Sequence, residues 1–284
     1  MKGLERLRPL AAGLDHPEGV SVGPDGMLWA GGEAGQVYRI DPADGSVEQV
    51  ASTGGAVLGL CLDAAGAVYV CDFGRLAVLR IDPASGTVER WCESIAGEPW
   101  VYPNWAAFAA DGSLYVSDSG REQLDACEGR IVRVPPGGGD GEALDLPPLH
   151  FANGLAVEPD GNLVVLESLD PRLSRVDLAT GELTELAVFP GTNPDGVACL
   201  ADGGHVISMY YPNHLWVVPA GGAPELLLDD SVGIHAPTPT NIAFYGPDLR
   251  TLALASLGGT WLSSLATDLV GAPLHYPPAV TMSR

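Results

Sequence analysis

Six residues in this sequence occupy the same place in a repeated pattern, and five of them carry a side-chain oxygen that could bind a cation. Each stands eight positions before the last residue of a turn, as Glu18 does in HPEGVSVGPDG and Asn153 does in FANGLAVEPDG. The six units recur at intervals of 40 to 49 residues, yet the register inside each unit is kept to the residue. We call these the slot residues: Glu18, Leu58, Asn104, Asn153, Asp195 and Asn241.

Four slot residues, Glu18, Asn104, Asn153 and Asp195, form a set of hard oxygen donors without Cys or His. Two carboxylates and two amide carbonyls suit one divalent cation, with Ca²⁺ as the first choice and Mg²⁺, Mn²⁺, Zn²⁺ or Fe²⁺ as alternatives. A single Asn or Asp before a strand is more often a turn residue that satisfies backbone groups. Four in register at one convergence point favour a metal site. Asn241 is either a ligand or a structural cap, and Leu58 offers only an apolar wall.

The elements that position the slot are predicted to be short β-strands. Each unit contains an apolar strand, a turn that is usually of the Asp-Gly type, and a second strand, and most continue with a third strand and a more polar fourth. Units of about forty residues with this content are typical of propeller blades. We therefore expect an all-β fold: one six-bladed β-propeller domain over residues 1–284, with four antiparallel strands per blade and the metal site in the central channel. Ring closure is expected to pair the region Leu4–Leu10 with the tail Pro273–Tyr276.

This topology places the slot at one rim of the channel, together with the loops that join second and third strands. A second column follows fourteen positions after the slot and includes Asp72, Asp118 and Glu167, which we expect to be exposed hairpin ends or ligands for substrate hydroxyls. The third unit is longer on this rim, over residues 119–129. His16 and His150 are candidates for proton transfer, although each is more typical of a loop histidine. The candidate substrate-binding residues are Asn104, Tyr102, Trp105, Glu122 and Tyr210.

Composition narrows the class of partner. The 284 residues carry a formal charge of −22, which disfavours nucleic acid and anionic membrane surfaces. No apolar run approaches the roughly 18 residues of a membrane helix. The start has no secretory signal pattern, and five scattered cysteines resemble the reduced thiols of a cytoplasmic protein. We expect a small-molecule substrate and see no evidence for a protein partner.

The slot motifs resemble those of one family. HPEGVSVGPDG, YPNWAAFAADGSLYVSD, FANGLAVEPDG and NPDGV are similar to segments of the calcium-dependent six-bladed propellers of the senescence-marker-protein (regucalcin), gluconolactonase and diisopropyl-fluorophosphatase group. The resemblance covers essentially the whole chain. It implies that Glu18, Asn153 and Asp195 bind the divalent ion. It also implies that Asn104 ligates the metal, as in the phosphatase-type members, or contacts water or substrate, as in the lactonase-type members.

Two departures from this family pattern affect the expected substrate. Tyr102 stands where sugar-lactonase members commonly have Arg, and Trp105 stands where Asp or Gly is usual. Both make the channel mouth more aromatic and less suited to sugar hydroxyls. The resemblance implies a metal-dependent hydrolase, foremost a lactonase, with Asp195 as general base or nucleophile. The alternatives are a phosphotriester or fluorophosphate hydrolase with the same site, and a non-enzymatic propeller that binds calcium or a small molecule.

Overall fold

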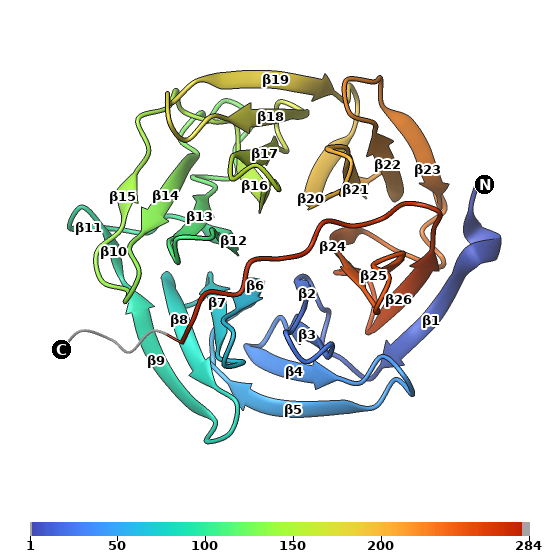
Figure 1. The fold of residues 1–284 in the computed structure, drawn as a ribbon, viewed down its shortest axis with the longest axis horizontal. Helices are drawn as coiled ribbons and strands as arrows, with labels where there is room; N and C mark the ends of the chain where they lie inside the picture. Colours follow the sequence, from blue (N-terminus) through green and yellow to red (C-terminus); the bar gives the residue numbers. More distant parts are fainter. Residues whose placement is uncertain (1, 280–284) are drawn as a thin grey trace.

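The computed structural model describes residues 2–279, and its strands form a closed ring of six four-stranded antiparallel sheets (Figure 1). Blade 1 contains β2 (Val20–Val22), β3 (Leu28–Gly31), β4 (Gln36–Ile40) and β5 (Val47–Ser52). Blade 2 contains β6 (Val57–Leu62), β7 (Val68–Asp72), β8 (Ala77–Asp82) and β9 (Thr87–Cys92). Blade 3 contains β12 (Pro103–Phe108), β13 (Leu114–Asp118), β14 (Arg130–Val134) and the short β15 (Glu142–Ala143).

The second half of the ring repeats this order. Blade 4 contains β16 (Ala152–Val157), β17 (Leu163–Glu167), β18 (Arg172–Val176) and β19 (Leu183–Val188). Blade 5 contains β20 (Asn193–Cys199), β21 (His205–Tyr211), β22 (His214–Val218) and β23 (Glu225–Asp229). Blade 6 contains β24 (Pro239–Tyr245), β25 (Thr251–Ser256), β26 (Trp261–Ala266) and β1 (Leu7–Ala12), which follows the 3₁₀ turn η1 (Leu4–Arg6). A small hairpin, β10 (Ser94–Ile95) with β11 (Glu98–Pro99), lies between blades 2 and 3 in the chain. The predicted six-bladed fold is confirmed.

The apolar core is divided among the contacts between neighbouring blades. Each of six clusters of buried side chains joins two adjacent blades, and together they cover all six junctions of the ring. Residues alternate along a strand, so both faces of each twisted blade present apolar side chains to a neighbour. Each inner strand is therefore held from both sides, which fixes the slot residues that it carries.

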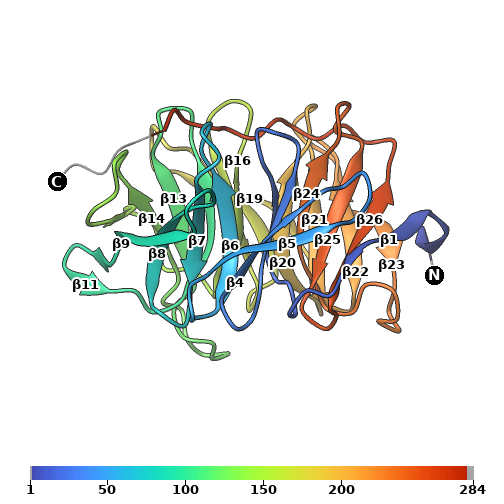
Figure 2. The ribbon, with the colours of Figure 1, turned by 90° about the horizontal axis from the view of Figure 1, so that it is seen from below.

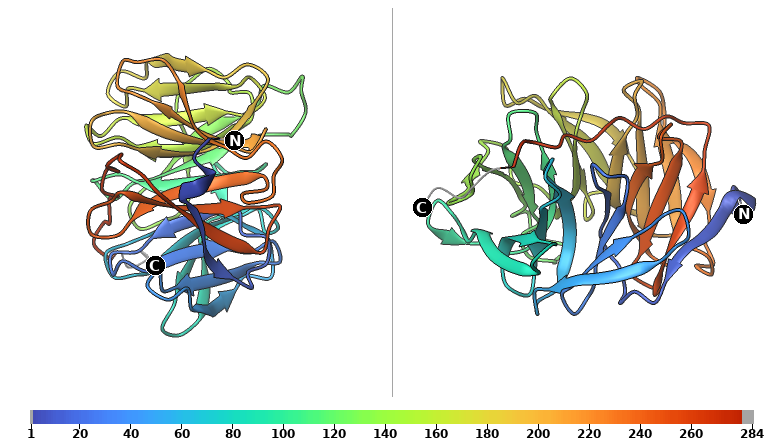
Figure 3. Two further views of the ribbon diagram at one scale, coloured as in Figure 1. Left: turned by 90° about the vertical axis from the view of Figure 1, so that its right-hand side faces the viewer. Right: turned by 60° about the horizontal axis from the view of Figure 1, so that its bottom comes forward.

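Ring closure uses the N-terminal strand as predicted, but the tail was assigned wrongly. β1 pairs with β26, with Leu7 opposite Leu265 and Ala12 opposite Trp261. The tail instead crosses the end of the channel at which the turns between first and second strands lie (Figures 1, 2 and 3). Its backbone hydrogen bonds reach several blades: Ala272 N–H donates to Cys199 O at 2.9 Å, and Pro277 O accepts from Ala64 N–H at 2.8 Å.

A cavity of about 80 Å³ lies in the channel beneath this tail. Side chains of all six inner strands line it, and Pro273, His275 and Tyr276 cover it. Tyr276 Oη also donates to Val22 O at 2.9 Å. The tail therefore covers one end of the channel, and the slot residues lie toward the opposite end. None of the helices in residues 2–279 is long and apolar enough to cross a membrane.

Candidate metal centre and channel mouth

The slot residues lie at an irregularity that recurs in the inner strands. In five of the blades the pairing of the first strand with the second shifts register at the slot, for example between Pro103 and Ala106 around Asn104. Glu18 immediately precedes the paired part of blade 1, which begins at Val20. A bulge leaves its residues unpaired and redirects their side chains. The repeated bulge thus explains why the slot register is kept to the residue.

Close approach of the inner strands brings the slots together. A Cβ atom on Gly59 would lie 2.6 Å from Asn104 O, and one on Gly154 would collide with Asp195 O. Glycine after the slot therefore lets one inner strand approach the backbone of the next. Across the junction of blades 6 and 1, Thr240 Oγ1 donates to Glu18 O at 2.6 Å. At these junctions, neighbouring inner strands therefore approach one another closely at the level of the slots.

Two serines orient the slot asparagines. Asn104 Nδ2 donates to Ser119 Oγ at 3.0 Å, and Ser119 Oγ donates to Ala152 O of the next blade at 2.6 Å. Asn153 Nδ2 likewise donates to Ser168 Oγ at 3.0 Å, and Ser168 Oγ donates to Pro194 O at 2.7 Å. Because each amide nitrogen is held, the amide oxygen is directed away from the serine.

The oxygens that remain have no partner among the described residues. Asn104 Oδ1, Asn153 Oδ1 and Asp195 Oδ1 are buried without a hydrogen bond, and so are both polar atoms of the Asn241 amide. A buried acceptor without a partner costs about 1–3 kcal/mol. Several such oxygens at one convergence point indicate a site built for a group that would satisfy them.

The raised pKa values of the two slot carboxylates also indicate a site for a cation. Burial raises the pKa of Glu18 to about 7, with further contributions from Glu33 and Glu122. Burial also raises the pKa of Asp195 well above its usual value, and the charge of Glu18 adds to this shift. Two carboxylates that repel one another in a poorly hydrated channel are stabilised in their ionised form by a cation. The donor set therefore fits one hard divalent ion held by Glu18, Asn104, Asn153 and Asp195.

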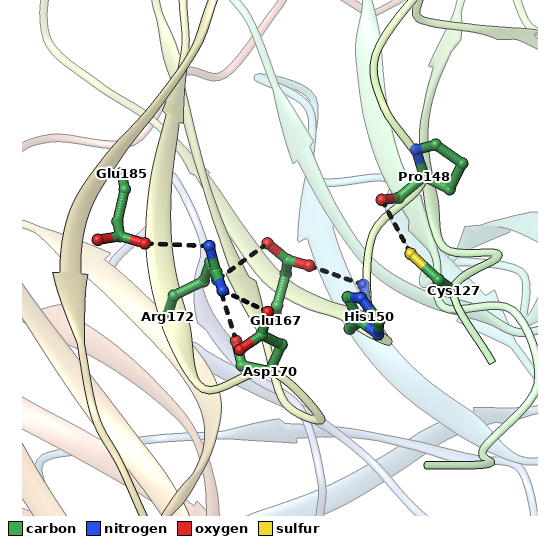
Figure 4. A network of polar contacts seen from close by, with 7 residues as sticks. All are labelled: Cys127, Pro148, His150, Glu167, Asp170, Arg172 and Glu185. Atoms are coloured by element: carbon green, nitrogen blue, oxygen red, sulfur yellow. Dashed lines mark hydrogen bonds and ion pairs between the residues drawn. The ribbon is translucent and has the colours of Figure 1, made fainter. Parts of the chain in front are cut away.

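The acidic second column was interpreted wrongly. Asp72, Asp118 and Glu167 are buried, not exposed. Asp118 Oδ1 accepts from Tyr102 N–H at 2.6 Å, and Glu167 Oε2 accepts from His150 N–H at 2.7 Å (Figure 4). Each of these carboxylates therefore holds the loop that leads into the slot of its own blade. Asp72 does the same in blade 2, where Oδ1 accepts from Ala56 N–H at 3.0 Å.

Three of the predicted substrate-binding residues are electrostatically coupled to the two slot carboxylates or to the tyrosines beside them. Burial raises the pKa of Tyr102, and the charges of Glu18, Glu122 and Asp195 raise it further. The pKa of Tyr210 is also raised by burial, with contributions from Asp195, Glu122 and Glu18. Electrostatic coupling of this kind requires proximity, so Tyr102, Tyr210 and Glu122 lie near the pair Glu18 and Asp195. Both tyrosines remain neutral phenols that can donate a hydrogen bond.

The other candidates lie elsewhere. Trp105 is buried in the cluster between blades 3 and 4 and lines the cavity beneath the tail, so its contact with a substrate stays a prediction. The His16 ring lies on the rim with Nδ1 3.1 Å from Asp15 Oδ1 and 3.4 Å from Glu33 Oε2. His150 is positioned through its backbone N–H by Glu167.

Sequence reasoning missed the two serines and two phenylalanines of the mouth. Ser119 and Ser168 stand fifteen positions after their slot asparagines, one position beyond the column that contains Asp118 and Glu167. Phe73 stacks on Tyr102 with ring centroids 4.1 Å apart, and Phe151 packs edge-on against the same ring at 5.4 Å. Phe73 also stands fifteen positions after its slot residue, Leu58. Alignment of the repeated units at this position could therefore have identified Phe73, Ser119 and Ser168, but not Phe151.

The chain matches the family model described as the SMP-30/Gluconolactonase/LRE-like region over residues 16–258. The chain belongs to this family. The matched region contains every slot residue and every loop of the channel mouth described above. Membership agrees with the resemblance of the slot motifs and with the six-bladed ring.

Solved structures show the same fold. A gluconolactonase from Xanthomonas campestris superposes with a TM-score of 0.78 at 21% identity, over 93% of this chain and 89% of that one. A calcium-binding protein, regucalcin, from Agrobacterium tumefaciens gives 0.75 at 18% identity, over 95% and 94% of the two chains. In sequence, the chain is 29% identical over 214 residues to strictosidine synthase-like 6 of Arabidopsis thaliana. That match covers 69% of this chain and only 57% of the relative's length.

Proposed function

We propose that this member of the SMP-30/gluconolactonase family is a divalent-metal-dependent lactonase. The observation that carries the proposal is the set of buried, unpartnered oxygens of Asn104, Asn153 and Asp195 beside Glu18. The family description and the gluconolactonase and calcium-binding structural neighbours support it.

Glu18, Asn104, Asn153 and Asp195 would hold the cation. When bound, the ion would supply Lewis-acid polarisation of the ester carbonyl and neutralise charge that develops on its oxygen. Ca²⁺ is the first choice for this ion, because all the donors are oxygens and two are neutral amides.

Asp195 is the proposed general base. Its buried carboxylate would accept a proton from the attacking water as that water adds to the carbonyl carbon. The ring C–O bond then breaks, and the proton passes to the departing alkoxide, so the products are one hydroxy acid and no further fragment. Glu18 acts mainly as a ligand. The phenols of Tyr102 and Tyr210 and the amide of Asn241 are available to orient the substrate.

The test measures hydrolysis by metal-free protein reloaded separately with Ca²⁺, Mg²⁺, Mn²⁺, Zn²⁺ or Fe²⁺. Sugar, aliphatic and aromatic lactones and one phosphotriester serve as substrates. We expect lactone opening that is lost with chelator. Asp195→Asn should lower kcat by about 10²-fold or more at saturating metal, as expected for loss of a general base. Calorimetry is used to check that the Asp195→Asn protein still binds the metal.

Glu98→Gln is the matched control, because Glu98 is exposed on the small hairpin β10–β11. It should leave hydrolysis unchanged. Failure of every metal-loaded form to open any ester would contradict the proposal and favour a propeller that only binds its ligand. Faster turnover of the phosphotriester than of all lactones would identify the alternative hydrolase. Undiminished hydrolysis by Asp195→Asn would remove Asp195 from the base role.

A further inference from the structure

Three aromatic rings from three neighbouring blades form a continuous wall at the channel mouth. We call Phe73, Tyr102 and Phe151 the aromatic wall. The Phe73 and Tyr102 rings stack with an interplanar angle of 27°, and Phe151 meets Tyr102 at 64°. Tyr102 and Phe151 each stand two positions before a slot asparagine. The wall is therefore next to the proposed metal ligands.

The wall offers apolar surface to solvent. Phe73 is 39% exposed, whereas Phe151 is buried. Other large apolar side chains of the same rim are also exposed, including Val101, Tyr210 and Leu124. Leu124 belongs to the longer rim loop of blade 3, between β13 and β14. Exposed apolar side chains beside converging polar groups are characteristic of a ligand-binding site.

The charges of the mouth disfavour an anion. Glu18, Glu33, Glu122 and Asp195 are acidic, and the whole chain carries −22. Three of the four arginines in these rim loops are already engaged: Arg121 with Glu128, Arg130 with Asp118, and Arg172 with Asp170 and Glu185. The fourth, Arg75, is exposed beside Phe73, so the acidic groups of the mouth still outnumber the cations that are left. A neutral ligand avoids the repulsion that an anionic ligand would meet.

We infer, resting on the lactonase function proposed above, that the substrate is a neutral lactone with an aromatic or alkyl substituent. The substituent packs on the aromatic wall, and the lactone carbonyl faces the slot oxygens. A polyhydroxylated sugar lactone is a poor fit, because its hydroxyls would lose water against the exposed parts of the Phe73 and Tyr102 rings. Aromatic faces bind apolar rings by offset stacking or edge contacts.

The experiment compares kcat/KM for an aryl-substituted γ-lactone, unsubstituted γ-butyrolactone and gluconolactone. We expect the aryl lactone to exceed gluconolactone by about tenfold or more, the low end of pocket discrimination. Phe73→Ser removes the exposed ring of the wall and should erase at least most of this advantage, with a smaller loss for γ-butyrolactone, which carries no substituent to pack on the wall. Phe73→Leu should restore part of it. Val188→Ala, on the outer strand β19, is the control for an exposed apolar residue.

A second measurement does not depend on turnover. The lactam analogue of the aryl lactone is titrated into metal-free protein by calorimetry, and Phe73→Ser should weaken its binding about tenfold. Equal kcat/KM for aryl lactone and gluconolactone, or equal losses for all lactones in Phe73→Ser, would overturn the inference. Absence of all lactone turnover with lactam binding that depends on Phe73 would overturn the lactonase function while supporting the inferred ligand class. Absence of both would overturn both.

Discussion

The amide orientation of Asn153 depends on one hydroxyl group. Ser168 Oγ accepts from Asn153 Nδ2 and donates to Pro194 O, which lies directly before Asp195. Groups that orient metal ligands typically contribute 10–100-fold to affinity. Ser168→Ala should therefore weaken binding of the divalent cation by about that factor, measured by calorimetry with chelator-treated protein.

The control for this change is Ser174→Ala in the same blade. Ser174 is buried on the third strand, β18, and does not hold a slot residue. It should leave cation affinity unchanged even if it lowers the melting temperature. Equal affinity of Ser168→Ala and the unmodified protein would show that the Asn153 carbonyl needs no such support.

The pKa of Glu18 gives the metal-free protein a specific pH dependence. Burial raises that pKa to about 7, above the value of an unfolded glutamate, so the folded state binds more protons between the two values. The free energy of unfolding must then fall as pH rises through this window. Thermal unfolding of metal-free protein should show a higher melting temperature near pH 5 than near pH 8. The difference should shrink in Glu18→Gln.

The exposed variant Glu98→Gln controls for the general repulsion among acidic groups, and it should keep the full pH dependence. A saturating divalent cation should also remove most of the Glu18 contribution, because it stabilises the ionised carboxylate. A melting temperature that rises from pH 5 to pH 8 in the metal-free protein would contradict this account of Glu18.

At the residue scale, the sequence predicted the slot residues but not the side chains that hold them and their loops in place. The slot was visible because one register carries oxygen donors in five of six units. The residues fifteen positions after the slot differ in type, as Phe73, Ser119 and Tyr210 illustrate. No shared side-chain type therefore identifies that position from sequence. Asp118 and Glu167 were misjudged because an acid at a strand end is ordinarily exposed. Only the fold shows that their loops return over them.

At the scale of the element, the inner strand must combine a bulge with close approach to its neighbour. Gly154 meets both demands, since a Cβ there would collide with Asp195 O and lie 2.8 Å from Gly196 Cα. Gly154→Ala should force blades 4 and 5 apart locally. We expect a loss of about 1–3 kcal/mol in the free energy of unfolding, the usual range for overpacking, together with weaker cation binding.

Chemical denaturation measures the first effect and calorimetry the second. Ala156→Ser, two residues further along β16, is a control of similar size that does not change the backbone approach. Unchanged cation affinity in Gly154→Ala would mean that the slot tolerates a displacement of its strands. Loss of stability without loss of affinity would separate the packing role of Gly154 from its role in the site.

The strands themselves were predictable because each unit repeats the same alternation of apolar segments and turns. The closing strand β1 was also placed in the correct region, but the tail was not. Residues 270–277 have no alternation of their own, and their partners, such as Cys199 and Ala64, come from distant units. A segment that is held by backbone contacts and channel packing leaves little pattern in its own sequence.

For the whole molecule, the two ends of the channel differ in kind. The tail and an apolar cavity occupy one end, and the slot residues lie toward the other (Figure 1). The net charge of the chain also affects how cations bind. At −22, the chain attracts cations nonspecifically as well as at the proposed site, and the two effects must be separated.

Specific binding stabilises the folded state by mass action, by about 2.7 kcal/mol when the free ion is at 100 times Kd. For a chain of this size that corresponds to a rise in melting temperature of roughly 5 °C. We expect Ca²⁺ to produce such a rise saturably and chelator to reverse it. NaCl at the same ionic strength should give a smaller, gradual change, because screening has no single-site saturation.

The double variant Glu18→Gln with Asp195→Asn should retain only the NaCl-like response. A Ca²⁺ response equal in both proteins would assign the stabilisation to the overall charge and not to the slot.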